Sequence, residues 1–169
     1  MSTSSLLTSL FEYKAWANQE LLVGVRDIDA EAHPKMHKLA IRLLNHTHVV
    51  DRIFAAHLIG EAHDYTASNT PDTPTLGELA ERVRASDAWY IDYIASLTAP
   101  QLAESIAFTF TDGQQGRMSR EEILAHLITH GGYHRGMIGR MLSELKLKPP
   151  RDVFTGYLHH IEIERRRLP

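Results

Sequence analysis

The sequence predicts an all-α fold: a four-helix bundle with a short extended or hairpin excursion before the fourth helix and a short C-terminal helix. Three observations support this prediction. Apolar residues recur at spacings of three and four over four long segments, which is the period of an amphipathic helix. Turn-forming residues separate these segments, and two Ser/Thr-x-x-Glu capping boxes mark helix starts. Because no repeat or linker interrupts the pattern, residues 1–169 are interpreted as one domain.

The first two helices are predicted at about residues 3–27 and 36–59. The apolar face of the first is formed by Leu7, Leu10, Phe11, Leu21 and Val25. His33-Pro34 separates the two helices, because the residue before a proline is pushed out of the helical region. The core face of the second helix is predicted to contain His46 together with Leu39, Leu43, Val50, Ile53 and His57.

The second half of the chain is predicted to hold two further long helices with short connections. Residues 60–74 are rich in turn formers, and the capping box Thr75–Glu78 starts a third helix that lasts until Ala99-Pro100. Apolar and polar residues then alternate around an Asp-Gly turn, which indicates the extended excursion. The capping box Ser119–Glu122 starts a fourth helix that runs to about residue 146. Asp152 is expected to cap the short C-terminal helix, through residue 164.

Composition narrows the functional classes. The net charge of −3 argues against a nucleic-acid or membrane-surface binder. The absence of cysteine excludes thiolate nucleophiles, disulfides and cysteine metal sites, so nitrogen and oxygen must hold any metal. The N-terminus does not resemble a signal peptide, and no apolar run reaches the ~18 residues that span a bilayer, so we expect a cytoplasmic protein. The eleven histidines are the compositional anomaly.

Three of these histidines lie four residues apart in the fourth helix, at His126, His130 and His134. Side chains at this spacing share one helix face, and two imidazoles can bind one metal ion from the same side. The outer two are separated by a helix rise of ~12 Å, which is too far for one ion. His130 and His134 fall on the apolar stripe with Ile123, Leu127, Met137 and Met141, and are therefore the predicted ligand pair.

A third ligand is expected from a facing helix. His46 lies on the predicted core face of the second helix, whereas His48 is ~200° further round and should face elsewhere. Three neutral nitrogens leave coordination positions open, as in catalytic metal sites. Such a site suits zinc or nickel, with iron or manganese as alternatives. In such a site the ion lowers the pKa of a bound water or acts as a Lewis acid on a substrate, and the sequence places no carboxylate as a general base.

Other residues are weaker candidates for a functional role. Gly131 and Gly132 between the two ligands predict close approach by another backbone or a ligand. Asp51 and Arg52 are interpreted as members of ion pairs or of a surface contact. Ser86 has no base at a recognisable sequence spacing, so a serine nucleophile is not supported.

Three stretches of the sequence resemble the DinB-like family. They are the YKAWAN stretch at residues 13–18, the second-helix histidine followed five residues later by Asp-Arg, and the run HLITHGGYHRG at residues 126–136. The resemblance implies a four-helix bundle, usually dimeric, that holds a divalent metal through His46, His130 and His134. Relatives in the wider superfamily include bacillithiol transferases and mycothiol-dependent isomerases, so a low-molecular-weight thiol is an implied partner.

The leading hypothesis is a divalent-metal-dependent enzyme, a hydrolase or a thiol transferase that acts on a small electrophile, and the expected assembly is a homodimer. The alternative is a non-catalytic metal-binding stress or interaction protein. A third interpretation leaves the three histidines as buried, hydrogen-bonded core residues without a metal.

Overall fold

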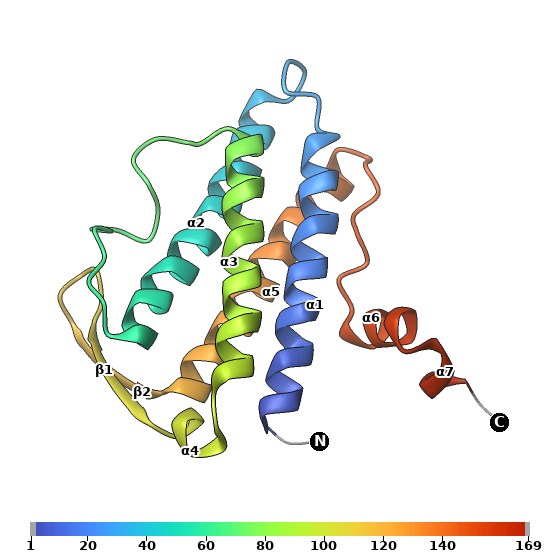
Figure 1. Cartoon of the computed structure of the whole chain (residues 1–169). Helices are drawn as coiled ribbons and strands as arrows, with labels where there is room; N and C mark the ends of the chain where they lie inside the picture. Colours follow the sequence, from blue (N-terminus) through green and yellow to red (C-terminus); the bar gives the residue numbers. More distant parts are fainter. Residues whose placement is uncertain (1–2, 168–169) are drawn as a thin grey trace.

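Four long helices form the body of the protein in the computed structural model, which describes residues 3–167 (Figure 1). They are α1 (Thr3–Arg26), α2 (Pro34–Ile59), α3 (Leu76–Ser96) and α5 (Arg120–Glu144). Helix α1 packs mainly against α3 and α5, and α2 packs against the same two helices from the other side. The mainly helical fold predicted from the sequence is therefore confirmed. Within the described residues, no helix is both long and apolar enough to cross a bilayer.

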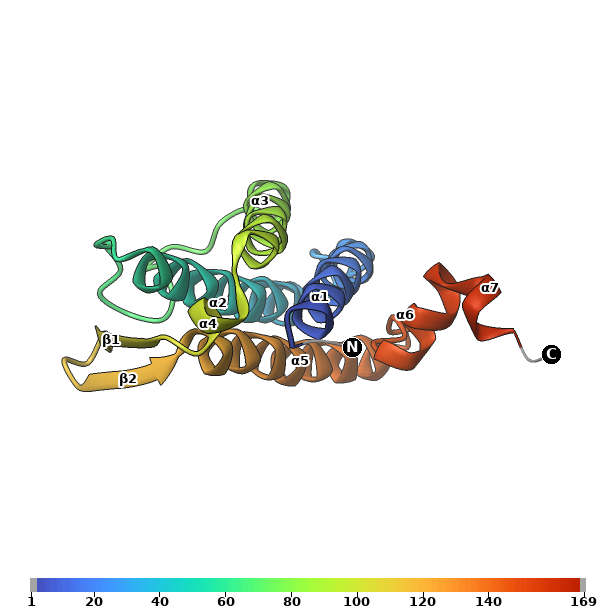
Figure 2. The ribbon, with the colours of Figure 1, turned by 60° about the horizontal axis from the view of Figure 1, so that its bottom comes forward.

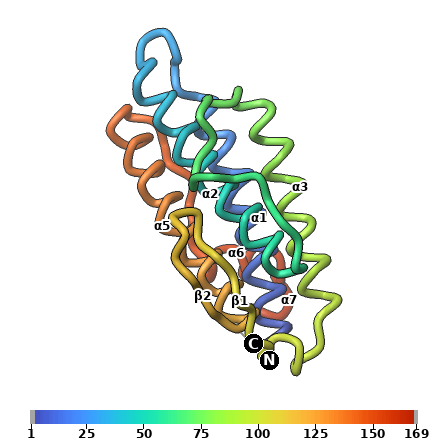
Figure 3. The backbone as a smooth tube through the Cα atoms, turned by 90° about the vertical axis from the view of Figure 1, so that its left-hand side faces the viewer, coloured from blue at the N-terminus to red at the C-terminus, as the bar shows by residue number. Residues whose placement is uncertain are grey.

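The connection between α2 and α3 is long, contrary to the predicted short connections. Helix α2 ends at Gly60, which takes the left-handed conformation with φ 74°. The segment 61–75 then runs back along the bundle to its opposite end (Figures 1 and 3). As a result α2 and α3 point in the same direction, and the segment lies over the outer side of both helices. It forms part of the candidate site described below.

The predicted hairpin is present between α3 and α5. Strands β1 (Ser105–Thr109) and β2 (Gln115–Ser119) pair antiparallel, with Ile106 opposite Met118. A short helix that was not predicted, α4 (Ala99–Leu102), precedes the hairpin. Pro100 was expected only to end the preceding helix, but it occupies the first turn of α4, where proline is tolerated.

The C-terminal segment forms two short helices, α6 (Phe154–Ile161) and α7 (Ile163–Arg166), rather than one. They project from the side of the bundle, next to α1 (Figures 1 and 2). The prediction that Asp152 caps this segment is wrong, because the N-cap position is Val153 and makes no side-chain hydrogen bond. Asp152 instead accepts hydrogen bonds from Tyr13 and Arg135, and so ties the segment to α1 and α5.

Two apolar clusters fill the bundle, one towards each end. One includes Phe11, Phe54, Tyr90, Ile94 and Leu127; the other includes Leu21, Val25, Leu44, Val83 and Ile138. Between them every long helix contributes a buried polar side chain. These residues, which we call the polar layer, are Lys14, Asn18, Asp51, Asp87 and Arg135. The polar layer thus separates the two apolar clusters of the core.

The predicted core stripes are partly wrong at their edges. Leu39 is 49% exposed and Met137 is 41% exposed. The true core face of α2 is rotated by about one position and contains Ala40, Leu44 and Asp51. Because an alanine and an aspartate lie on this face, its apolar pattern is weaker than that of the neighbouring leucines, which led to the error.

Candidate metal centre

The three predicted histidine ligands come together between α2 and α5. His130 and His134 lie one turn apart on α5, and His46 reaches them from α2. The imidazole centroid of His46 is 4.9 Å from that of His130 and 4.7 Å from that of His134. One ring nitrogen from each of the three lies within 4.8 Å of the other two, and the side chains are half-buried. This group could hold a metal ion.

The spacing of the nitrogens fits a metal ion after only a small adjustment. His46 Nε2 and His130 Nε2 are 3.0 Å apart. Two nitrogens at ~2.1 Å from one ion and at the tetrahedral angle are separated by about 3.4 Å. The Nδ1 atoms of His130 and His134 are buried and have no protein hydrogen-bond partner. His130 turns Nε2 towards His46, so an ion bound there would not satisfy its Nδ1, and it is the convergence of the three rings that indicates a metal site.

Residues of the long 61–75 segment orient the ligand from α2. His46 Nδ1 lies 2.7 Å from the backbone oxygen of Ser68. Since a carbonyl oxygen can only accept, Nδ1 carries the proton and Nε2 keeps its lone pair free for a metal. The neighbouring Asn45 donates to the side chains of Asn69 and Thr70, which fixes the segment against α2. Sequence reasoning missed this support, because an irregular segment has no period that indicates what it contacts.

The local environment keeps the two ligands of α5 neutral. Burial, followed by the nearby imidazoles and Lys14, lowers the pKa of His130 to about 4. Burial and His46 also lower the pKa of His134. Neutral imidazole is the form that binds metals, so at pH 7 these two side chains need not lose a proton to bind an ion.

The two other candidate histidines lie outside the ligand group. His126 stacks on His130, with a centroid separation of 5.3 Å, but does not belong to the group. His48 also stays outside the group and faces elsewhere than His46, but it is buried and contacts α3, although it was not placed on the predicted core stripe of α2. Its Nδ1 lies 3.3 Å from Ser86 Oγ, so that serine does contact a base, from another helix.

A buried ion-pair network lies behind the site, in the polar layer. Lys14 Nζ is 2.7 Å from Asp51 Oδ2 and 2.8 Å from Asp87 Oδ1. Asn18 donates to Asp87, and Arg135 donates to Asn18. Burial disfavours the charged form of Lys14, but the two carboxylates outweigh this effect and raise the lysine pKa above its usual value. The network joins all four long helices at the level of the metal ligands.

The predicted close approach at the two glycines of α5 is made by side chains of this network. A Cβ on Gly131 would be 3.1 Å from Arg135 Nη1 and 3.6 Å from Lys14 Cε. A Cβ on Gly132 would meet only Arg135, at an ordinary 3.8 Å. Gly131 therefore makes room for two buried cationic side chains, and not for a second backbone.

Sequence reasoning missed most of the polar layer, although a signal was present. On α1 the buried positions Leu7, Phe11, Lys14, Asn18, Leu21 and Val25 follow spacings of four and three without a break. Two polar residues at core positions of such a stripe indicate a buried polar contact. Asp51 was interpreted as a member of an ion pair, and the structure identifies Lys14 as its partner. Arg52 forms no ion pair within residues 3–167.

Comparison with known proteins identifies the family of this chain. The family model described as the DinB family matches residues 1–166. The chain is also similar to Protein DinB of Bacillus subtilis (strain 168), with 24% identity over 173 residues that cover 96% of this chain and 99% of that protein. No solved structure matches it. Because the family model covers nearly the whole sequence, the chain belongs to the DinB family.

Proposed function

We propose that this protein binds one divalent metal ion through His46, His130 and His134 and is a metal-dependent enzyme. The proposed reaction is hydrolysis of a small electrophile or transfer of a low-molecular-weight thiol to it. The observation that supports this proposal is the convergence of three imidazole nitrogens within 4.8 Å on a half-buried face between two helices. Three protein ligands leave further coordination positions for substrate, which is the pattern of catalytic rather than structural sites.

The residues of the chain have distinct tasks in this proposal. His130 and His134 supply neutral donors from one rigid helix, and Ser68 holds the His46 ring in the tautomer that exposes Nε2. A divalent ion bound there supplies Lewis acidity and lowers the pKa of a coordinated water or thiol. No carboxylate of the described residues belongs to the ligand group, so the proposal assigns no carboxylate as a general base.

The proposed ion is zinc or nickel, with iron or manganese also compatible with three nitrogen donors. A small-molecule substrate and a homodimeric assembly complete the proposal. The assembly follows from the family resemblance alone, and sedimentation of the purified protein tests it directly.

Metal content and thermal unfolding test the site. We expect about one ion per chain by elemental analysis, and a sharp loss of metal in His46→Ala and in His130→Ala. His126→Ala is the matched control, since it removes a stacked imidazole outside the ligand group and should keep the metal. An ion present at a hundred times its Kd stabilises the folded state by about 2.7 kcal/mol, so chelation should lower Tm. Unchanged unfolding on chelation would favour three core histidines without a metal.

Turnover separates the enzyme from a non-catalytic metal-binding protein. The lack of a carboxylate in the histidine group favours this second candidate. The metal-loaded protein should be assayed with pairs of thiols and electrophiles and with simple esters and amides. The enzyme proposal expects a rate that disappears in His130→Ala and persists in His126→Ala. Full metal occupancy without turnover in any of these assays would instead support the non-catalytic protein.

A further inference from the structure

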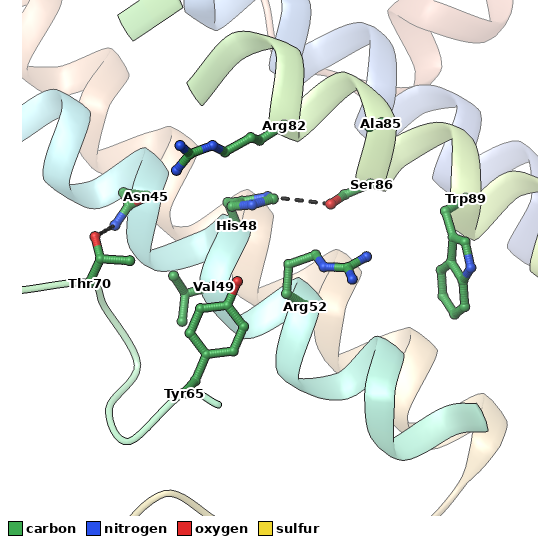
Figure 4. A pocket seen from close by; sticks show the side chains of 10 residues that line it. All are labelled: Asn45, His48, Val49, Arg52, Tyr65, Thr70, Arg82, Ala85, Ser86 and Trp89. Atoms are coloured by element: carbon green, nitrogen blue, oxygen red, sulfur yellow. Dashed lines mark hydrogen bonds between the residues drawn. The ribbon is translucent and has the colours of Figure 1, made fainter. Parts of the chain in front are cut away.

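A cavity of about 540 Å³ lies on the other side of α2 from the histidine group. Its walls come from α2, α3 and the long 61–75 segment (Figure 4). None of the three candidate metal ligands lines it. Its volume falls within the range of about 300–1,000 Å³ that is common for small-molecule sites. The cavity is thus large enough to hold a ligand independently of the metal.

Two arginines give this cavity a positive character. Arg52 of α2 and Arg82 of α3 both line it, and neither forms an ion pair with an acidic side chain of residues 3–167. Glu78, one turn before Arg82, is engaged by Thr75 in the capping box of α3. Figure 4 shows the two arginine side chains on either side of the His48–Ser86 pair. Two guanidinium groups without acidic partners are suited to a carboxylate or phosphate group.

The rest of the wall is uncharged and includes two large aromatic side chains. Trp89 of α3 is half-buried and Tyr65 of the long segment faces the same space, so both offer ring surface to a ligand. His48 and Ser86 are buried and hydrogen-bonded to each other, and supply polar groups at the cavity wall. No acidic side chain lines the cavity to repel an anion.

We propose that this cavity is a second ligand site, which binds a small aromatic anion. Arg52 and Arg82 supply the positive charge that attracts its carboxylate or phosphate group, and Trp89 and Tyr65 line the space for its ring. The cavity is distinct from the histidine group, because none of the three candidate ligands lines it. The Trp89 indole lies at the cavity wall, so binding changes its fluorescence.

Phenylphosphonate is the probe that tests the proposal, with inorganic phosphate and benzylamine for comparison. In a Trp16→Phe background, which leaves Trp89 as the only tryptophan, titration should show saturable quenching by phenylphosphonate. Inorganic phosphate should bind more weakly because it lacks the ring, and benzylamine should not bind. Equal binding of benzylamine and phenylphosphonate would overturn the proposal, as would the absence of saturable binding by calorimetry.

Arginine variants locate the site. Arg52→Gln and Arg82→Gln should each weaken phenylphosphonate binding about tenfold, the loss expected for one charge-assisted hydrogen bond. Both side chains are exposed, so the variants should fold normally, which circular dichroism checks. Arg84→Gln is the matched control, because Arg84 lies on the same helix but pairs with Glu81 outside the cavity. Equal weakening in the control, or loss of binding on chelation of the metal, would refute the proposed site.

Discussion

Replacing Lys14 by methionine tests whether the polar layer holds the bundle together. The ammonium group contacts Asp51 and Asp87 at 2.7 and 2.8 Å, and the side chains of all three are at least 93% buried. Methionine keeps much of the volume of lysine but removes its charge. The variant therefore leaves two buried carboxylates without their shared cation, at the level where the four helices meet.

Lys14→Met should lower the free energy of unfolding strongly, because the two carboxylates that lose their cation are buried. Removing one partner of a buried pair typically costs about 3–5 kcal/mol, since an uncompensated charge stays in a medium of low polarity. In a domain of this size about 1 kcal/mol corresponds to 2–4 °C in Tm, so we expect a fall of roughly 6–20 °C. Burial already raises the pKa of Asp51, and loss of Lys14 should raise it further. Protonation of Asp51 removes its buried negative charge. The difference in unfolding free energy between wild type and variant should therefore shrink as the pH falls.

Urea unfolding of wild type and variant at pH 7 and pH 5 measures both effects. Lys38→Met serves as control, because Lys38 is exposed on α2 and its loss should change stability by less than about 0.5 kcal/mol. Combining Lys14→Met with Asp51→Asn and Asp87→Asn should recover much of the lost stability. A loss below about 1 kcal/mol for Lys14→Met would refute the reasoning, since it would mean that water reaches the carboxylates.

Three further predictions concern pH and packing. Burial, followed by the charges of Arg52 and Arg82, lowers the pKa of His48 to about 4. An unfolded histidine titrates near 6.5, so the stability contributed by neutral His48 is present at pH 7 and is lost as the pH falls through 6.5 towards 4. By pH 4.5, urea unfolding of the wild type should show a loss of about 2–3 kcal/mol in unfolding free energy. The variant His48→Gln should lack this loss. Gly116→Ala should destabilise the hairpin region by roughly 1–3 kcal/mol in the same assay, because its Cβ would lie 2.5 Å from Phe108. Gly136→Ala should instead raise stability by about 0.5–1 kcal/mol, since this exposed helical position has nothing within 4 Å, and a lower Tm would contradict it.

The local signals in the sequence predicted the helices well. The capping boxes at Thr75 and Ser119 start α3 and α5 as expected, and the Asp-Gly turn forms within the hairpin. These features depend on hydrogen bonds between residues three or four apart, so they can be recognised without knowledge of the fold. The stripe on α2 was displaced because its true core face includes the small Ala40 and the charged Asp51, which weaken the apolar pattern.

The sequence by itself also selected His46, His130 and His134, because helix rise and the spacing of side chains limit which imidazoles can share an ion. Only the tertiary structure decided what surrounds them. Ser68 reaches His46 from an irregular segment, and Lys14 finds its two carboxylates on different helices. Such contacts join residues that are 22 to 73 positions apart, where no local period operates. The packing of the bundle alone brings them within hydrogen-bond distance.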